Sequence, residues 1–284
     1  MTTIDLNHLR TWIGRTTDDD DVLNPRHARL MAATLGQSQL PLQTGAQLPP
    51  LWHWLYFLQG LPPTELGPDS HPARGGFLPP VPLANRMWAG GQLDFDGVLP
   101  LGASVRKRSQ VVAVDHKRGR SGDLVFVTVR HEVLHDGRAV ITERHDIVFK
   151  DPSPPQAAGV VTDQPRPTPL HVEHFTPNST TLFRYSALTF NGHRIHYDVD
   201  YCREVEGYPA LVIHGPLNAT LLAGLAQRVS GLPLRRFEYR GLRPALLGQT
   251  LRLEAAADPA DPKRLLLCMV LANRTASMQA TATF

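Results

Sequence analysis

Short apolar runs bounded by turn residues occur toward the end of each half of the chain, those of the first half rich in β-branched residues, which is the pattern of strands in antiparallel sheets. In the first half these runs are Ser104 to Asp115, Asp123 to Leu134 and Ala139 to Lys150. In the second half they are Leu234 to Leu242, Thr250 to Ala256, Arg264 to Ala272 and Ala276 to Phe284. Turn residues separate the runs, among them Asp136-Gly137, a strong signal of a tight hairpin. Each half is therefore expected to close on an antiparallel meander.

A helix is predicted ahead of the strands in each half. The apolar run Pro216 to Val229 begins with proline and is followed by Gly231, which are typical first and last positions of a helix. In the first half Asn24 is a cap, followed by Pro25 and an apolar run that ends at Gly36. The acidic run Asp18 to Asp21 ahead of it is interpreted as a solvated loop.

The middle of the first half carries aromatic residues and glycine pairs. The aromatic cluster Trp52, Trp54, Tyr56 and Phe57 is expected to form core or a subunit contact rather than a ligand cage. The glycine pairs in RGGF and AGGQ are expected at turns or bulges, because a GG pair alone is a weak phosphate-loop signal.

A proline-rich segment divides the chain. Residues 151–170 hold six prolines and almost no large apolar residue, a composition typical of a linker. The predicted organisation is an N-terminal half over 1–150, a linker over 151–170 and a C-terminal half over 171–284. Because each half combines a helix with an antiparallel sheet, the fold class is α+β with an internal duplication.

Composition narrows the choice of partners. The 284 residues are 42% hydrophobic and 19% charged, with no apolar run near the roughly 20 residues that span a bilayer and no recognisable secretion signal, so we expect a cytoplasmic protein without a membrane partner. The net charge of +3 is spread over scattered arginines without a nucleic-acid module, so no nucleic-acid partner is expected, whereas a polyanionic small molecule fits. Only two cysteines occur, and both are expected to be reduced and buried.

The densest collection of chemical groups lies between residues 182 and 217. It includes three histidines: His193, His196 and His214. Neutral imidazole can take a proton from water and return it to carbon. These histidines could also bind a metal, but no cysteine or second carboxylate completes a ligand set, so no metal is expected. Free backbone N–H groups at the predicted helix start, His214-Gly215-Pro216, can stabilise negative charge on an oxygen.

The segment YSALTFNGHRIHYD resembles the hydratase motif of the MaoC-like and (R)-specific enoyl-CoA hydratase 2 families, whose aspartate and histidine activate water. The resemblance places His196 at the histidine position and Asn191 at the aspartate position. Further segments, EGYPALVIHGPL and RGGFLPPVPLANRMWAGG, are similar to the subgroup that contains mesaconyl-C4-CoA hydratase, itaconyl-CoA hydratase and the hydroxyacyl-thioester dehydratases.

This resemblance implies a double hot-dog fold with a degenerate first half, an acyl-CoA substrate and no cofactor other than the coenzyme A of that substrate. Asn191 cannot be a base, so it is expected to orient water while His193 or His196 takes the proton. His214 and Gly215 are expected at the thioester oxygen. Arg184 and Tyr185 are candidates for substrate or coenzyme A contact, although packing also fits Tyr185. Asp198 is expected to orient an imidazole.

The expected activity is interconversion of an enoyl-CoA and a 3-hydroxyacyl-CoA with a short branched or dicarboxylic acyl group. Two alternatives remain open: an acyl-CoA thioesterase of the same fold, and an acyl-CoA-binding protein without catalysis. A homodimer is possible through the sheet edges that such folds present.

Overall fold

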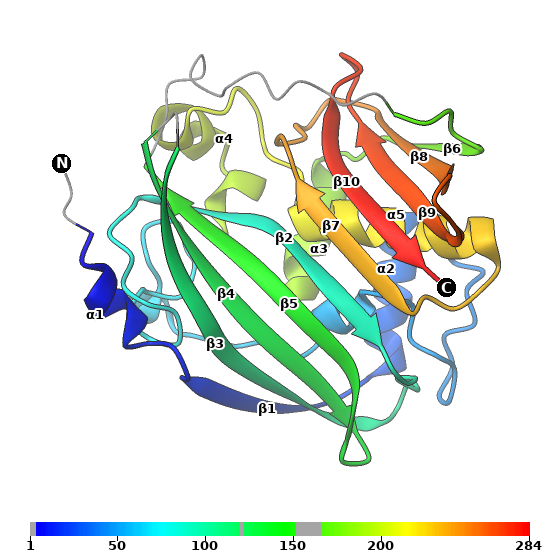
Figure 1. Ribbon diagram of the computed structural model, residues 1–284, viewed down its shortest axis with the longest axis horizontal. Helices are drawn as coiled ribbons and strands as arrows, with labels where there is room; N and C mark the ends of the chain where they lie inside the picture. Colours follow the sequence, from blue (N-terminus) through cyan, green and yellow to red (C-terminus); the bar gives the residue numbers. More distant parts are fainter. Residues whose placement is uncertain (1–3, 120–121, 152–165) are drawn as a thin grey trace.

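Ten strands form one antiparallel sheet in the computed structural model, which describes residues 4–119, 122–151 and 166–284 (Figure 1). The strand order is β1-β3-β4-β5-β2-β7-β10-β9-β8-β6. The first five strands are β1 Thr16–Val22, β2 Asn85–Phe95, β3 Ser104–Gly119, β4 Gly122–His135 and β5 Arg138–Lys150. The other five are β6 His171–Phe175, β7 Arg236–Gly241, β8 Leu251–Asp258, β9 Asp261–Val270 and β10 Ala276–Thr283.

The two halves join through β2 and β7, which pair from Gly90 opposite Arg240 to Asp94 opposite Arg236. At Gly90 a side chain has no room, since a Cβ there would lie 2.7 Å from the carbonyl oxygen of Tyr239. The register of β2 against β5 also shifts between Trp88 and Gly90. The expectation of a bulge at AGGQ is therefore confirmed, and Gly75 of RGGF, at φ +95°, makes a turn.

Helices cover one face of the sheet (Figure 1). The longer ones are α2 Pro25–Leu35, α3 Ser179–Thr189 and α5 Gly215–Ser230; α1 Leu6–Arg10 and α4 Val199–Tyr201 are short. Within the described ranges, 3-10 turns lie at Trp52–Leu55, Pro63–Glu65 and Arg194–His196, and a π-helix lies at Cys202–Glu206. Helix α5 is buried along most of its length and contacts β7 to β10. The predicted helices are confirmed, including the Asn24 cap of α2, whose side chain accepts from the Arg26 N–H.

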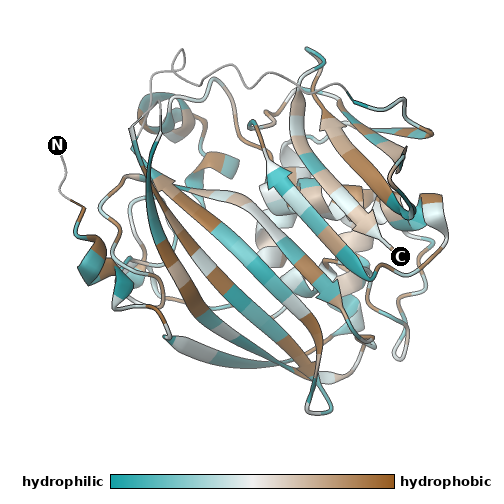
Figure 2. Ribbon diagram, viewed as in Figure 1, coloured by the Kyte–Doolittle hydropathy of each residue, from teal (hydrophilic) through white to brown (hydrophobic). Residues whose placement is uncertain are grey.

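The predicted strands are confirmed in both halves, and polar and apolar residues alternate along β3, β4 and β5 (Figure 2). The interpretation of the acidic run as a loop was wrong, because Asp18 to Asp21 lie within β1 at the sheet edge. There Asp18 and Asp20 form bidentate ion pairs with Arg108 and Arg106 of β3. A row of carboxylates is compatible with a strand when the neighbouring strand supplies the opposite charge.

The aromatic cluster lies in the core, as expected: Trp52, Tyr56 and Phe57 are buried, and Trp54 packs against them. Both cysteines are buried, and neither forms a disulfide. Most of the predicted linker lies outside the described residues, so the domain division remains a prediction. Across the described ranges no helix has the length and apolar character needed to cross a membrane.

Candidate functional site

A cavity of about 520 Å³ lies between the two halves of the sheet. Strands β2, β4 and β5 line it from the first half, and residues 191–196 with the first turn of α5 line it from the second. Residues between 71 and 78, residues 241–245, and Glu206 with Tyr208 also contribute to the lining. Because both halves contribute walls, neither half forms the cavity alone.

The end of α3 positions Asn191. Phe190 adopts a left-handed conformation at φ 48°, and the Asn191 N–H donates to the Ser186 carbonyl at 2.8 Å. The Asn191 side-chain oxygen accepts from the His193 N–H at 2.9 Å, which closes a tight turn. Among the described residues no group accepts from the Asn191 amide nitrogen, so this cavity-lining NH₂ is available to a ligand or water.

Four imidazole rings form a row beside the cavity. The ring centroids of His71 and His193 are 4.3 Å apart, and those of His193 and His196 are 5.5 Å apart. His196 then stacks on His214, with centroids 3.6 Å apart and an interplanar angle of 19°. The two motif histidines are therefore brought together, as the sequence predicted, and two further histidines extend the row.

The hydrogen bonds of His196 fix its tautomer. Its Nδ1 lies 2.7 Å from the Val212 carbonyl oxygen, which can only accept, so Nδ1 carries the proton and Nε2 keeps its lone pair. Burial lowers the pKa of His196 to about 4 and that of His193 to about 2. Both rings are therefore neutral near pH 7 and can accept a hydrogen bond.

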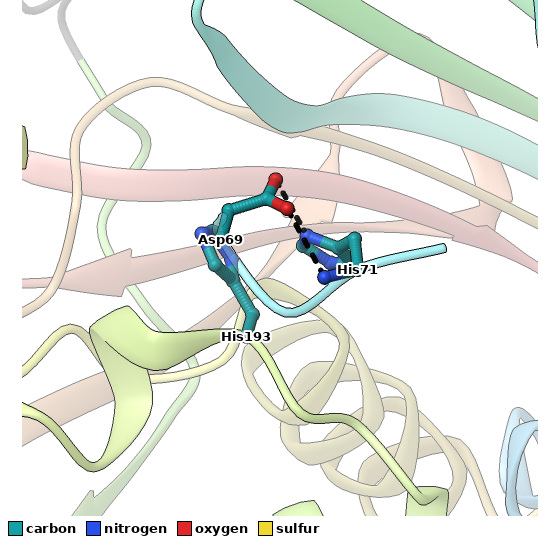
Figure 3. Close-up of side chains that lie close together, drawn as sticks. All are labelled: Asp69, His71 and His193. Carbon is teal, nitrogen blue, oxygen red and sulfur yellow. Dashed lines mark hydrogen bonds and ion pairs between the residues drawn. The ribbon is translucent and has the colours of Figure 1, made fainter. Parts of the chain in front are cut away.

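A loop of the first half, residues 67–73, brings Asp69 and His71 next to His193 (Figure 3). The Asp69 carboxylate accepts from Nδ1 of His71 at 3.1 Å, and a Cβ at Gly192 would lie only 3.1 Å from the Ser70 carbonyl oxygen. The Arg194 N–H donates to the Asp69 carbonyl at 3.2 Å. The sequence interpretation missed this loop; its one signal is that PDSHP lies one residue ahead of the RGGF segment.

Asp69, His71 and His193 have the spacing of metal ligands, since one ligand atom from each lies within 4.8 Å of the others. The carboxylate is already hydrogen-bonded to one nitrogen of His71, so the arrangement is held together without an ion. Burial opposes the charge of Asp69, but the hydrogen bond and charge of His71 outweigh it and hold the pKa of this carboxyl well below its usual range.

The start of α5 forms the other end of the site. Gly215 lines the cavity as the first residue of the helix, and Pro216 follows it without an N–H. Asn218, on the same turn, also lines the cavity, and its buried side-chain oxygen has no hydrogen-bond partner. The helix N-terminus suits a ligand oxygen that gains negative charge. The Asn218 side-chain oxygen can only accept, so it suits a donor group of a ligand or water instead.

The His214 side chain is fully buried and outside the cavity lining. Its Nε2 lies 2.8 Å from the Ser186 hydroxyl, and its ring supports His196 from behind. Of the predicted pair at the thioester oxygen, only Gly215 therefore reaches the cavity.

Two further predicted contacts need correction, and a third residue lies outside the cavity lining. Asp198 does not orient an imidazole: its carboxylate accepts from Arg194 at 2.7 Å and from the Tyr201 N–H at 3.0 Å. Tyr185 is buried beside His214, 4.8 Å between ring centroids, and does not line the cavity, which fits the packing alternative. Arg184 is exposed on α3, outside the cavity lining, so it is not placed to contact an acyl group there.

Comparison with solved structures defines the class of fold. A MaoC-like dehydratase from Phytophthora capsici superposes with a TM-score of 0.75 at 12% identity, covering 99% of this chain and 97% of that one. A Mycobacterium tuberculosis protein described as a double hot-dog superposes with a TM-score of 0.59 at 15% identity, covering 95% of this chain and 96% of the other. The chain therefore has the double hot-dog fold of MaoC-like dehydratases.

Sequence comparison defines the family. The family model for hydroxyacyl-thioester dehydratase type 2 matches residues 51–247, and the chain belongs to this family. The chain is also 42% identical over 236 residues to mesaconyl-C(4)-CoA hydratase of Chloroflexus aurantiacus, covering 82% of this chain and 83% of the relative. The recognised resemblance and the expected fold class are thus confirmed.

Proposed function

We propose that the protein is a hydro-lyase that interconverts an enoyl-CoA and a 3-hydroxyacyl-CoA. The observation that carries this proposal is the cavity in which Asn191, His193 and His196 face the start of α5. Neutral imidazoles that accept hydrogen bonds can hold a water molecule, and a helix N-terminus can hold the thioester oxygen. These are the two requirements for adding water to a conjugated thioester.

In the proposed reaction, the thioester oxygen lies against the Gly215 N–H. Attack of water on C3 of the enoyl group moves negative charge onto that oxygen, where the helix N-terminus stabilises it. The Asn191 amide donates to the water oxygen and the lone pair of a neutral imidazole, that of His193 or His196, accepts one of its protons, which directs the water toward C3. Dehydration follows the same path in reverse.

The acyl group is proposed to be short and dicarboxylic, like the mesaconyl group in the name of the Chloroflexus relative. Arg86 of β2 supports this proposal because it lines the cavity and because no described residue forms a hydrogen bond or ion pair with it. Burial lowers the pKa of Arg86 to about 10, so the guanidinium remains charged near pH 7. The nearby Asp69 carboxylate favours this charge without forming an ion pair with Arg86, so a substrate carboxylate could pair with the guanidinium directly.

The purified protein should be tested on mesaconyl-, itaconyl- and crotonyl-CoA by the absorbance of the conjugated thioester. We expect hydration of at least one, and a loss of about 10²- to 10⁴-fold in kcat for His193→Ala and His196→Ala. A thiol reagent in parallel identifies a thioesterase by release of free coenzyme A. No turnover of any thioester, or wild-type rates in both variants, contradicts the proposal; binding of coenzyme A without turnover favours the non-catalytic alternative.

A homodimer is proposed as well, because the outermost strands β1 and β6 leave sheet edges that a second chain could pair with or cover. Sedimentation of the purified protein tests this, and a monomer at all concentrations contradicts it. The cytoplasmic location remains a prediction.

A further inference from the structure

Glu206 is the one acidic residue among the described residues that line the cavity. Its side chain is 7% exposed, so the carboxyl group is withdrawn from bulk water. It belongs to the EGYPALVIHGPL segment, which the resemblance singled out without giving the glutamate a role. A buried carboxyl group in a cavity needs a partner or a function.

The local backbone directs this side chain inward. Glu206 ends the π-helix Cys202–Glu206, and Gly207 then turns the chain in a left-handed conformation at φ 77°. The Tyr208 N–H donates back to the Cys202 carbonyl at 2.7 Å, which closes the wide turn. Single π-turns of this kind occur frequently at functional sites.

Glu206 faces His193 across a short gap. Its Oε1 lies 4.0 Å from Nε2 of His193, too far for a direct hydrogen bond. That nitrogen is buried and has no partner. A water oxygen can lie about 2.8 Å from both atoms at once, one proton toward each. The gap therefore has the size and the two acceptors that a bound water requires.

We propose that Glu206 is the group that removes the proton from the attacking water, taking the role of the family aspartate that Asn191 replaces. His193 then accepts a hydrogen bond from the second proton of the same water, and His196 packs edge-on against the His193 ring, with centroids 5.5 Å apart, and so holds that ring in place. This inference rests on the proposed hydratase activity and identifies its base.

The proton balance is complete without another reactant. The Glu206 carboxylate takes one proton as the water oxygen bonds to C3, and the π electrons of the double bond move into the thioester enolate. The resulting Glu206 carboxylic acid gives the proton to C2 as the enolate collapses. The sum is one water added across the double bond, with Glu206 again a carboxylate.

Electrostatics favour the carboxyl over the imidazole as proton acceptor. Burial raises the pKa of Glu206, and the nearby negative charge of Asp69 raises it further, whereas burial lowers the pKa of His193 to about 2. Lys150 and a hydrogen bond with Tyr201 act in the opposite direction on Glu206. The titratable and charged groups facing Glu206 are His193, Tyr201, Cys202, Tyr208, Asp69 and Lys150.

Glu206→Gln in the full-length protein tests the proposal, and Glu204→Gln, at an exposed position of the same π-helix, is the matched control. We expect kcat on the best thioester substrate to fall about 10²- to 10⁴-fold in Glu206→Gln, with little change in KM or melting temperature. Glu204→Gln should match the wild type. Glu206→Asp, which keeps the carboxyl but moves it, should give an intermediate kcat.

The pH dependence separates a base from a structural residue. Because Glu206 must be ionised to accept a proton, wild-type kcat should fall toward acid pH, and this fall should disappear from the residual rate of Glu206→Gln. A wild-type kcat with an unchanged acid limb in Glu206→Gln overturns the inference while leaving the hydratase activity standing. Loss of wild-type activity on chelation, restored by zinc, also overturns it, in favour of a metal at Asp69, His71 and His193.

Discussion

Gly215→Ala should displace the start of α5, where the thioester oxygen is proposed to bind, because the added methyl group collides with Trp88. A Cβ at this position would lie 2.7 Å from Cε3 of Trp88, well inside ordinary contact distances that begin at 3.4 Å. The Trp88 ring cannot easily yield, because it stacks on Tyr239 at 4.4 Å and meets Trp54 edge-on at 5.3 Å. The first turn of α5 is therefore expected to move instead.

The difference between 3.4 and 2.7 Å requires a displacement of about 0.7 Å, shared between the helix start and its neighbours. Overpacking of this kind costs about 1–3 kcal/mol of stability. A misplacement of about 1 Å in a catalytic group costs about 10²-fold in rate. We therefore expect kcat to fall about 10- to 100-fold in Gly215→Ala, with a lower melting temperature.

Initial rates on the best thioester and calorimetric melting temperatures measure both effects. The control is Gly224→Ala on the same helix, where the nearest neighbour of a new Cβ is the flexible end of Arg228 at 3.1 Å. Glycine costs a helix interior up to about 1 kcal/mol relative to alanine, so this control should keep its kcat and should not melt earlier. Wild-type kcat and melting temperature in Gly215→Ala, or equal losses in both variants, would refute the steric reasoning.

Three further predictions concern pH, the loop at 67–73 and substrate preference. Burial lowers the pKa of His145 to about 4, so the neutral ring contributes its full stability above pH 6.5, and this contribution is lost as the pH falls toward 4. In denaturant titrations between pH 7 and pH 5, the free energy of unfolding of His145→Leu should therefore fall by up to about 2 kcal/mol less than that of the wild type. In Gly192→Ala the new Cβ would lie 3.1 Å from the Ser70 carbonyl oxygen, so kcat/KM from initial rates should fall about 3- to 10-fold. In the control Gly60→Ala the new Cβ has open space around it, so kcat/KM should match the wild type. In Arg86→Gln, KM for a dicarboxylic thioester should rise about 10- to 100-fold, while KM for a thioester with an uncharged acyl group of equal length stays unchanged. Equal rises in KM for both thioesters would indicate that Arg86 contacts coenzyme A instead.

Local patterns in the sequence were sufficient for most of the secondary structure. Buried and less buried positions alternate along much of β3, β4 and β5, because one face of each strand packs on the core, and this pattern lies in the strand's own residues. The cap at Asn24 and the stop at Gly36 are likewise local. The short edge strand β1 was missed because the arginines that neutralise its aspartates lie on β3, about 90 positions along the chain.

The sequence by itself also determined the family, the cluster of Asn191, His193 and His196, and the substitution of an amide for the family aspartate, because these are properties of one contiguous segment. Tertiary structure alone decided which other groups meet that segment. Asp69 and His71 come from the opposite half of the chain, and Glu206 reaches His193 only through the π-turn that follows α4. Asp198, two residues from His196, faces Arg194 instead. Proximity in sequence does not fix the direction of a side chain, whereas packing between the two halves does.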